Sequence, residues 1–378
     1  MKKFFFFAAA VVAMAACQKE AQLSSNEFAA PVEDGAPVAV SFNSNVKATV
    51  STKAQGGVDA WDATQNLHIY GYQRVEGGVD YTTATPFINN VVAASPAADA
   101  TNNQLSVLNE NGKPFYYVSN YTYDFYGFYV DDLAVEPQTT ATGVYVPVTI
   151  TGGEDLMVAK ADPSVDGTAL SDFRFAYSAY AARRGVQPTL NFQHQLVRFR
   201  FQITSGTTFE TTGDAEKNMY VTGLTLNARN TADLYVAGET VGLQNISDAR
   251  ADLALRSLVD GALTELVSYE LPDKDATVAE GANVLGESLM VIPNADLTAS
   301  FEGALTVTQF GETHTVPFTL ETEKLLEAAE KQFAPGYSYV VTIKLYGLEA
   351  VVISAELEPW KDGGKIEIDT DEEPEIFE

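Results

Sequence analysis

The sequence predicts an all-β protein built from two β-sandwiches. Apolar and polar residues alternate in short runs along most of the 378-residue chain, which is the period of a half-buried strand. Turn-forming residues separate these runs at short, fairly even intervals, and the chain contains 27 glycines and 15 prolines. Runs spaced in this way are typical of sandwiches, and the length suits two domains.

The first expected strands lie between residues 37 and 72. Apolar side chains fall at every second position in residues 38–42. In residues 67–72, Leu67 and Ile69 point to one face of a strand, while Tyr70 and Tyr72 point to the other. This second strand has the pattern of a core strand.

An aromatic run follows at residues 114–130, with the sequence PFYYVSNYTYDFYGFYV. Such a run could form a platform on which sugars stack. Its spacing of two favours a different interpretation, because Tyr123 and Phe125 would face one way and Tyr126 and Phe128 the other. We therefore predict a central strand with both faces buried.

A change of domain is expected near residues 186–195. The segment ARRGVQP, residues 182–188, has the charge and the turn residues of a linker. The first sandwich is accordingly predicted over residues 37–187 and the second over residues 188–361. Further strands are expected at residues 143–150, 156–161, 189–204, 219–228, 232–238, 287–293, 304–311, 313–320, 338–348 and 350–360.

Charge and motifs argue against several classes of function. The chain has 51 acidic and 23 basic residues, a net charge of −28, which disfavours a nucleic-acid partner because phosphate contacts need clustered Lys and Arg. No nucleophile elbow, zinc-binding helix motif or phosphate loop occurs. His68, His194 and His314 are far apart in strand-like runs, where we expect core-edge or surface positions. The sequence therefore predicts no catalytic residues, no metal and no cofactor.

The start of the chain has the features of an export signal. Lys2 and Lys3 precede an apolar stretch that is too short to be a typical membrane-spanning helix, and Ala15 and Ala16 come just before Cys17. This resembles the lipobox of bacterial lipoproteins, in which the cysteine receives the lipid, so Cys17 is the predicted lipidation site. The alternative is an ordinary secretory signal with an incidental cysteine. Residues 1–17 are the expected signal, and residues 18–36 are expected to be a flexible leader because they lack apolar periodicity.

The end of the chain, residues 362–378, has the pattern of a strand with one apolar face. Ile366, Ile368, Thr370 and Ile376 lie at even positions, and acidic residues lie between them. Glu372 and Pro374 interrupt this row, and proline cannot donate a hydrogen bond to a neighbouring strand. Pairing is thus expected over residues 365–370, with a second anchor at Ile376 and Phe377. The alternative is a frayed acidic terminus.

The order of these landmarks resembles the fimbrillin family, the lipoprotein precursors of type V pili in Bacteroides-like bacteria. The most specific segments are FQHQLVRFRF at residues 192–201, PGYSYVVTIKLYGL at residues 335–348, and LEPW at residues 357–360. The resemblance covers most of the chain from the signal to Trp360. It implies two transthyretin-like β-sandwich domains and export to the outer membrane as a lipoprotein.

The resemblance also implies processing and polymerisation. A trypsin-like protease would remove the leader and first strand, and the C-terminal strand of another subunit would fill the groove left behind. Of the bonds after Lys47, Lys53 and Arg74, the one between Lys53 and Ala54 is predicted to be cut, because it follows the first strands in a segment expected to be accessible. The family usually has arginine at that position, so Lys53 departs from its pattern.

The predicted function is a structural, non-enzymatic pilus subunit that supports adhesion and ends in a cell-surface fimbrium. Its expected partners are copies of itself, other fimbrial subunits, the processing protease and, through the lipid, a membrane. A tip or anchor subunit, a glycan-binding surface lipoprotein and a secreted enzyme remain as alternatives. A glycan-binding lipoprotein would keep its leader and would not need the strand-like tail.

Overall fold

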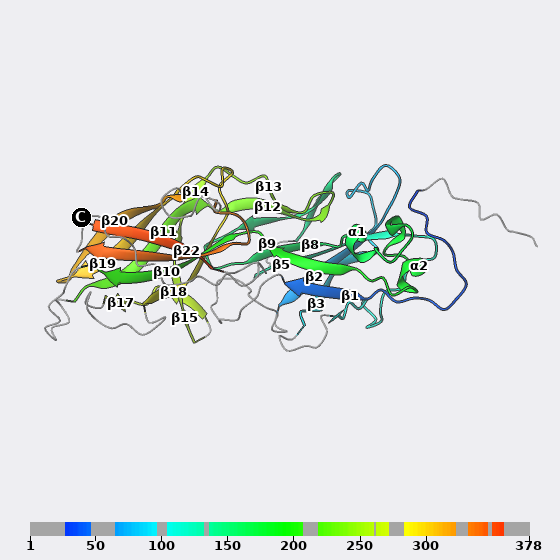
Figure 1. Ribbon diagram of the computed structural model, residues 1–378, viewed down its shortest axis with the longest axis horizontal. Coiled ribbons are helices and arrows are strands. Elements are labelled where there is room, and N and C mark those ends of the chain that lie inside the picture. Colours follow the sequence, from blue (N-terminus) through cyan, green and yellow to red (C-terminus); the bar gives the residue numbers. More distant parts are fainter. Residues whose placement is uncertain are drawn as a thin grey trace, which may run out of the picture.

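The computed structural model describes residues 27–46, 65–96, 104–131, 136–206, 218–260, 262–271, 283–322, 332–346 and 350–358. Within these ranges nearly all regular structure is β, which confirms the predicted fold class. The strands form an elongated body with the first and second halves of the chain toward opposite ends (Figure 1). No helix in the described ranges is long and apolar enough to cross a membrane.

The first half is organised around a seven-stranded sheet. Its strands follow the order β3-β2-β5-β8-β9-β1-β4, in which β1 lies between β9 and β4 rather than at an edge. The bounds are β1 (Phe42–Val46), β2 (Asn66–Gln73), β3 (Ile88–Ala94), β4 (Gln104–Leu105), β5 (Tyr123–Val130), β8 (Leu156–Lys160) and β9 (Thr189–His194). Three short helices follow β8 and precede β9, namely α1 (Pro163–Asp166), η1 (Phe173–Phe175) and α2 (Ala179–Ala182).

A four-stranded sheet, β13-β12-β7-β6, covers part of the seven-stranded sheet. Its members come from both halves of the chain: β6 (Gln138–Thr140), β7 (Gly143–Thr149), β12 (Thr231–Gly238) and β13 (Gly242–Gln244). Strand β12 pairs antiparallel with β7 over the length of both strands. The two halves are therefore joined by backbone hydrogen bonds as well as by the chain itself.

The second half contains two further sheets. Their orders are β18-β10-β21-β22 and β14-β11-β19-β20, and β17 pairs with β11. The bounds are β10 (Val197–Ser205), β11 (Tyr220–Arg229), β14 (Arg250–Ala254), β17 (Tyr269–Glu270), β18 (Val284–Val291), β19 (Phe301–Gln309), β20 (Glu312–Leu320), β21 (Ser338–Tyr346) and β22 (Ala350–Glu358). A small hairpin, β15 (Arg256–Val259) with β16 (Ala262–Glu265), lies beside β18.

Burial confirms the two-faced strand that the sequence predicts. On β5, Tyr123 and Phe125 belong to a core on one side of the seven-stranded sheet. Tyr126 and Phe128 belong to a larger core that continues into the second half. The aromatic run therefore includes a buried central strand, paired with β2 on one side and β8 on the other.

The chain passes from the first half to the second between β9 and β10, at the end of the expected boundary region of residues 186–195. Residues from 188 onward were assigned to the second sandwich, but β9 pairs with β8 and β1 in the seven-stranded sheet. Phe192 lies in the core of the first half, whereas Leu196 lies in the larger core. The alternation in residues 189–204 correctly predicts strand structure. These residues form two strands, β9 and β10, because the chain leaves one sheet at Gln195 and enters another.

Candidate functional site

The most informative site is the place occupied by the first strand. β1 runs parallel to β9, with Val46 opposite Phe192, and antiparallel to β4, with Phe42 opposite Leu105. The chain just before β1 is also paired. The Val40 amide donates to the Phe115 carbonyl at 2.8 Å, and the Tyr117 amide donates to the Val38 carbonyl at 3.0 Å. Residues 38–46 thus fill a slot: residues 38–40 pair with residues 115–117, Phe42 and Asn43 pair with β4, and residues 43–46 pair with β9.

The side chains of this segment divide between the two faces as the sequence predicts. Val40 and Phe42 are 6% and 1% exposed, and Ser44, two positions later, is also buried. The Phe42 ring meets the Phe125 ring edge-on at a centroid distance of 5.0 Å. Asn43 lies between these residues and is only half-buried. The segment is held by an apolar row on one face as well as by its backbone.

The chain before this slot lies against the protein surface. Residues 27–36 belong to the predicted flexible leader, residues 18–36; residues 18–26 lie outside the described ranges. The buried Thr122 hydroxyl donates to the Phe28 carbonyl at 2.8 Å, and Arg74 lies over the Phe28 ring. The segment lacks apolar periodicity because polar and ionic contacts, rather than a sheet face, hold it.

An ion pair holds the same segment further along. The two guanidinium nitrogens of Arg184 reach the two carboxylate oxygens of Glu33 at 2.5 and 3.0 Å. This hydrogen-bonded pairing lowers the pKa of Glu33. Arg183 donates to the Ala36 carbonyl at 3.0 Å. Both arginines lie in residues 182–188, the predicted linker. Their positive charge is opposite to that of the leader carboxylates, and this is the sequence signal that could have revealed the contact.

The three histidines are not brought together. His194 is buried, and its Nδ1 lies 2.9 Å from the Asp155 carboxylate. His68, on β2, is half-buried, contacts Asn90 and stacks on Phe128. His314, on β20, is exposed. His68 and His314 lie at core-edge and surface positions, as expected, whereas His194 is buried.

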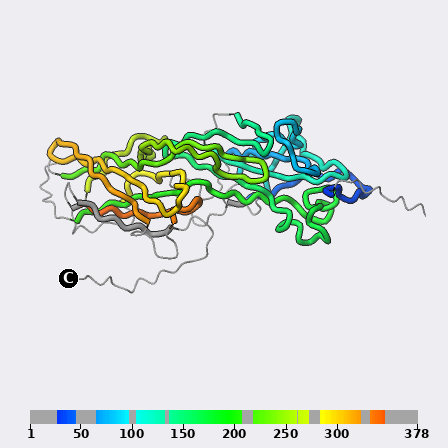
Figure 2. The backbone as a smooth tube through the Cα atoms, turned by 90° about the horizontal axis from the view of Figure 1, so that it is seen from above, coloured from blue at the N-terminus to red at the C-terminus, as the bar shows by residue number. Residues whose placement is uncertain are grey.

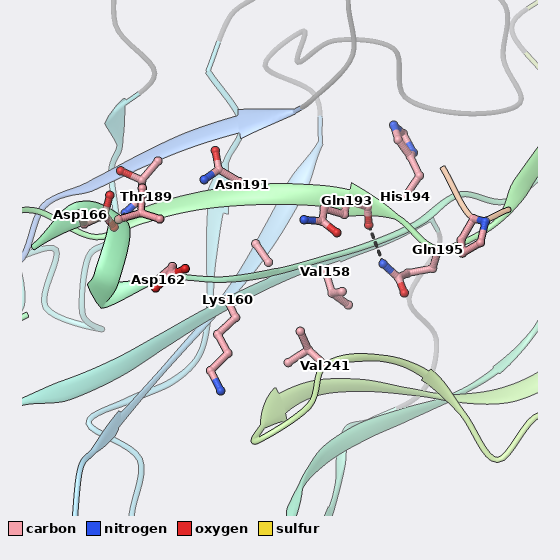
Figure 3. Close-up of a pocket in the computed structure, with 13 residues that line it drawn as sticks. Val158, Lys160, Asp162, Asp166, Thr189, Asn191, Gln193, His194, Gln195 and Val241 are labelled. Atoms are coloured by element: carbon pink, nitrogen blue, oxygen red, sulfur yellow. Dashed lines mark hydrogen bonds between the residues drawn. The ribbon is translucent and has the colours of Figure 1, made fainter. Parts of the chain in front are cut away.

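A polar cavity of about 460 Å³ lies over β8 and β9 (Figure 3). Alternate residues of β9 present their side chains to it: Thr189, Asn191 and Gln193. Lys160 lines it and donates to the carbonyls of Gly238 and Glu239. The remaining lining residues are Val158, Ala159, Asp162, Val165, Asp166, His194, Gln195, Val241 and Pro335.

This lining is suited to binding a polar molecule. Eight of the thirteen lining residues have polar or charged side chains, and the cavity has the size of a small-ligand site. Both carboxylates of the lining also have structural roles. Asp162 caps α1, accepting from the amide and hydroxyl of Ser164, and these hydrogen bonds lower its pKa. Asp166 accepts from the Thr189 amide at 2.9 Å.

The remaining predicted site residues lie outside the described ranges. They are the lipidation site Cys17, the processing site Lys53 and Ala54, and the tail residues Ile366, Ile368, Thr370, Ile376 and Phe377. Within the described part of the chain, no three His, Cys, Asp or Glu side chains are grouped so that they could hold a metal ion.

Comparison with known proteins identifies the family. Residues 50–360 match the fimbrillin-like family. The chain belongs to this family. No curated protein matches the sequence.

Solved structures that match this chain include three proteins from Bacteroides species. A candidate cell adhesion protein from Bacteroides uniformis is 17% identical, with a TM-score of 0.47, and the match covers 86% of this fimbrillin-like chain and 98% of the other. A candidate cell adhesion protein from Bacteroides ovatus is 14% identical, with a TM-score of 0.45 and coverage of 86% and 99%. A candidate polysaccharide-binding protein from Bacteroides thetaiotaomicron is 11% identical, with a TM-score of 0.41 and coverage of 85% and 96%.

Proposed function

We propose that this fimbrillin-like chain is a structural, non-enzymatic subunit of a cell-surface pilus that supports adhesion. In this proposal it is exported as a lipoprotein through Cys17, processed between Lys53 and Ala54, and polymerised by strand exchange. A trypsin-like protease and other fimbrial subunits are its partners. The observation that carries the proposal is the place of β1 inside a sheet, at the beginning of the chain.

Loss of β1 would create a site for another strand. The segment ending at Val46 lies just before the proposed cut, so processing would detach it from the rest of the chain. Its departure would leave the backbone of β9 and β4 without this partner. The places of Val40 and Phe42 would become an open apolar slot. An unpaired strand edge with an apolar slot invites another strand to pair with it.

The tail has the sequence to fill that slot. Ile366, Ile368 and Thr370 repeat the spacing of two that Val40, Phe42 and Ser44 follow in residues 40–44. A strand added with its even positions facing inward would place its isoleucines against the core and its acidic residues toward the outer face. A tail supplied by a second copy would then join the subunits.

The polymerisation test is a comparison of tail variants. Deletion of residues 364–378, or the pair Ile366→Asp with Ile368→Asp, is expected to give a folded, exported and processed protein that forms no fibres in electron micrographs. The pair Glu367→Gln with Asp369→Asn is the matched control, since it alters the outward positions, and it should still polymerise. Normal fibres from the deletion or aspartate variants would refute the donor role of the tail.

Export and processing have separate tests. Cys17→Ala should abolish incorporation of radioactive lipid and delivery to the surface. N-terminal sequencing of the mature protein should begin at Ala54. Lipid labelling of the Cys17→Ala protein, or a different N-terminus, would contradict the corresponding step while leaving the polymerisation test unaffected.

A glycan-binding role is the second candidate, and the polar cavity over β8 and β9 favours it. The side chains of Asn191 and Gln193 could hydrogen-bond sugar hydroxyls there. Binding to a glycan array that is lost in Asn191→Ala with Gln193→Ala, while fibres still form, would assign adhesion to this cavity. Equal binding by the variant would remove the cavity from consideration. A tip or anchor role in the pilus would instead follow from immunogold labelling confined to one end of the fibre.

A further inference from the structure

The surface under the leader has an unusual composition for this protein. We call it the arginine surface and define it as Arg74, Thr122, Tyr180, Arg183 and Arg184. It lies at the end of the molecule where the blue N-terminal segment runs, beyond β1 and beside α2 (Figures 1 and 2). Adjacent arginines are notable in a chain with 23 basic and 51 acidic residues.

The contacts of this surface resemble a peptide-binding site. It receives the leader through backbone carbonyls, at Thr122 and Arg183, and through a carboxylate at Arg184. The Arg184 guanidinium is held 3.7 Å above the Tyr180 ring and also donates to the Tyr180 carbonyl. A guanidinium stacked in this way is already oriented for bidentate pairing with a carboxylate. The site is therefore suited to a segment that offers backbone carbonyls and an acidic side chain.

Removal of the leader would change the charge of this surface. Arg74 has a carboxylate partner that remains, because it is bound to Asp124 at 2.6 Å. Arg184 instead has its carboxylate partner, Glu33, in the leader itself. Departure of residues 27–36 would therefore expose a positive surface on a strongly negative protein, at the same moment as it opened the slot of β1.

The acidic end of the tail has the matching chemistry. Residues 371–378, DEEPEIFE, combine carboxylates, a proline and a phenylalanine, as residues 27–34 of the leader, EFAAPVED, also do. Glu372 and Pro374 interrupt the apolar alternation of the tail, so this part is poorly suited to continue a strand in the slot. Binding to a charged surface outside the sheet would account for its composition.

We propose that the arginine surface is a second contact of the subunit joint, and that after processing it binds residues 371–378 of the tail of a second copy. This rests on the proposed function and adds an electrostatic contact to it. The leader enters the slot of β1 from the arginine surface, so a donor strand with residues 365–370 in the slot must run opposite to β1 to bring residues 371–378 onto that surface. The leader thereby blocks both contacts until it is removed.

The test measures binding of the tail to the processed protein. A protease site that replaces residues 50–53 in the whole precursor allows cleavage without the native protease. The cut leader is separated from the rest of the protein, and a fluorescent peptide of residues 364–378 is then titrated into the leader-free protein at low and high salt. Arg183→Gln with Arg184→Gln is expected to weaken binding about tenfold and to flatten its salt dependence. Lys113→Gln with Arg250→Gln removes the same charge elsewhere and should leave the affinity unchanged.

Two altered peptides separate this inference from the proposed function. A peptide whose carboxylates at residues 371–375 are changed to amides should bind the unchanged protein as weakly as the unchanged peptide binds the arginine variant. The altered peptide should bind the arginine variant no more weakly than that. A peptide with Ile366→Asp and Ile368→Asp should not bind at all. If only the isoleucine changes matter, the arginine surface is not part of the joint while the donor strand survives. If the isoleucine changes have no effect, the proposed donor strand itself is wrong.

Discussion

Phe42→Ala is the sharpest test of the idea that β1 is a displaceable strand. Phe42 is 1% exposed and lies edge-on against Phe125. Truncation removes most of a buried ring and leaves a cavity, which destabilises proteins by about 3–5 kcal/mol. We take about 3 kcal/mol, because a slot at one side of the sheet can partly close. In the uncut precursor this should lower the melting temperature by about 4 °C.

The effect should be larger and more specific after the chain is cut. The segment of residues 27–53 is then held only by non-covalent contacts, so a loss of about 3 kcal/mol should speed its dissociation roughly 150-fold if the whole loss falls on the bound state. The assay uses precursors with a protease site in place of residues 50–53 and follows release of a fluorophore on the leader. Strand exchange with a tail peptide should accelerate in parallel.

The control and the refuting result follow from the two faces of the strand. Asn43→Ala changes the half-buried outer face and should alter release less than threefold. Fibres assembled after complete removal of the leader should be identical for all variants, because the remaining chains have the same sequence. If Phe42→Ala and the unchanged precursor release the leader at the same rate, the contacts of Phe42 do not hold the segment, and the proposed slot is wrong.

Three further predictions concern stability. His194→Ala removes the imidazole that contacts the buried Asp155 carboxylate. The free energy of unfolding, measured in urea, should therefore fall by about 2–4 kcal/mol. A loss below about 1 kcal/mol would contradict a structural role for the pair. In Gly127→Ala the new methyl carbon would lie 2.7 Å from a buried phenylalanine ring, so a calorimetric loss of about 1–3 kcal/mol is expected, and an unchanged melting temperature would show that the core has space there. Burial raises the pKa of Tyr72 and Tyr123 to about 12, so the folded protein keeps two phenol protons that the unfolded chain loses near pH 10. The free energy of unfolding should therefore be unchanged below about pH 10 and should fall between about pH 10 and 12. A free energy of unfolding that stays constant across that range would refute this.

The sequence by itself determined the strands and their faces. Alternation with a period of two is a local property, and it correctly separated Tyr123 and Phe125 from Tyr126 and Phe128. The same period identified the inward residues Val40 and Phe42 of the first strand. The family followed from the order of such segments along the chain, which also needs no knowledge of strand pairing.

Only the tertiary structure decided which strands pair and which charges meet. Alternation says which side of a strand is buried but not which strand lies beside it, so the sequence could not place β9 in the first sheet or β12 beside β7. The leader escaped prediction for a related reason. Its contacts are polar, and the ion pair of Glu33 with Arg184 joins residues 151 positions apart, so no local period records it. Such long-range contacts depend on how the whole chain folds back on itself.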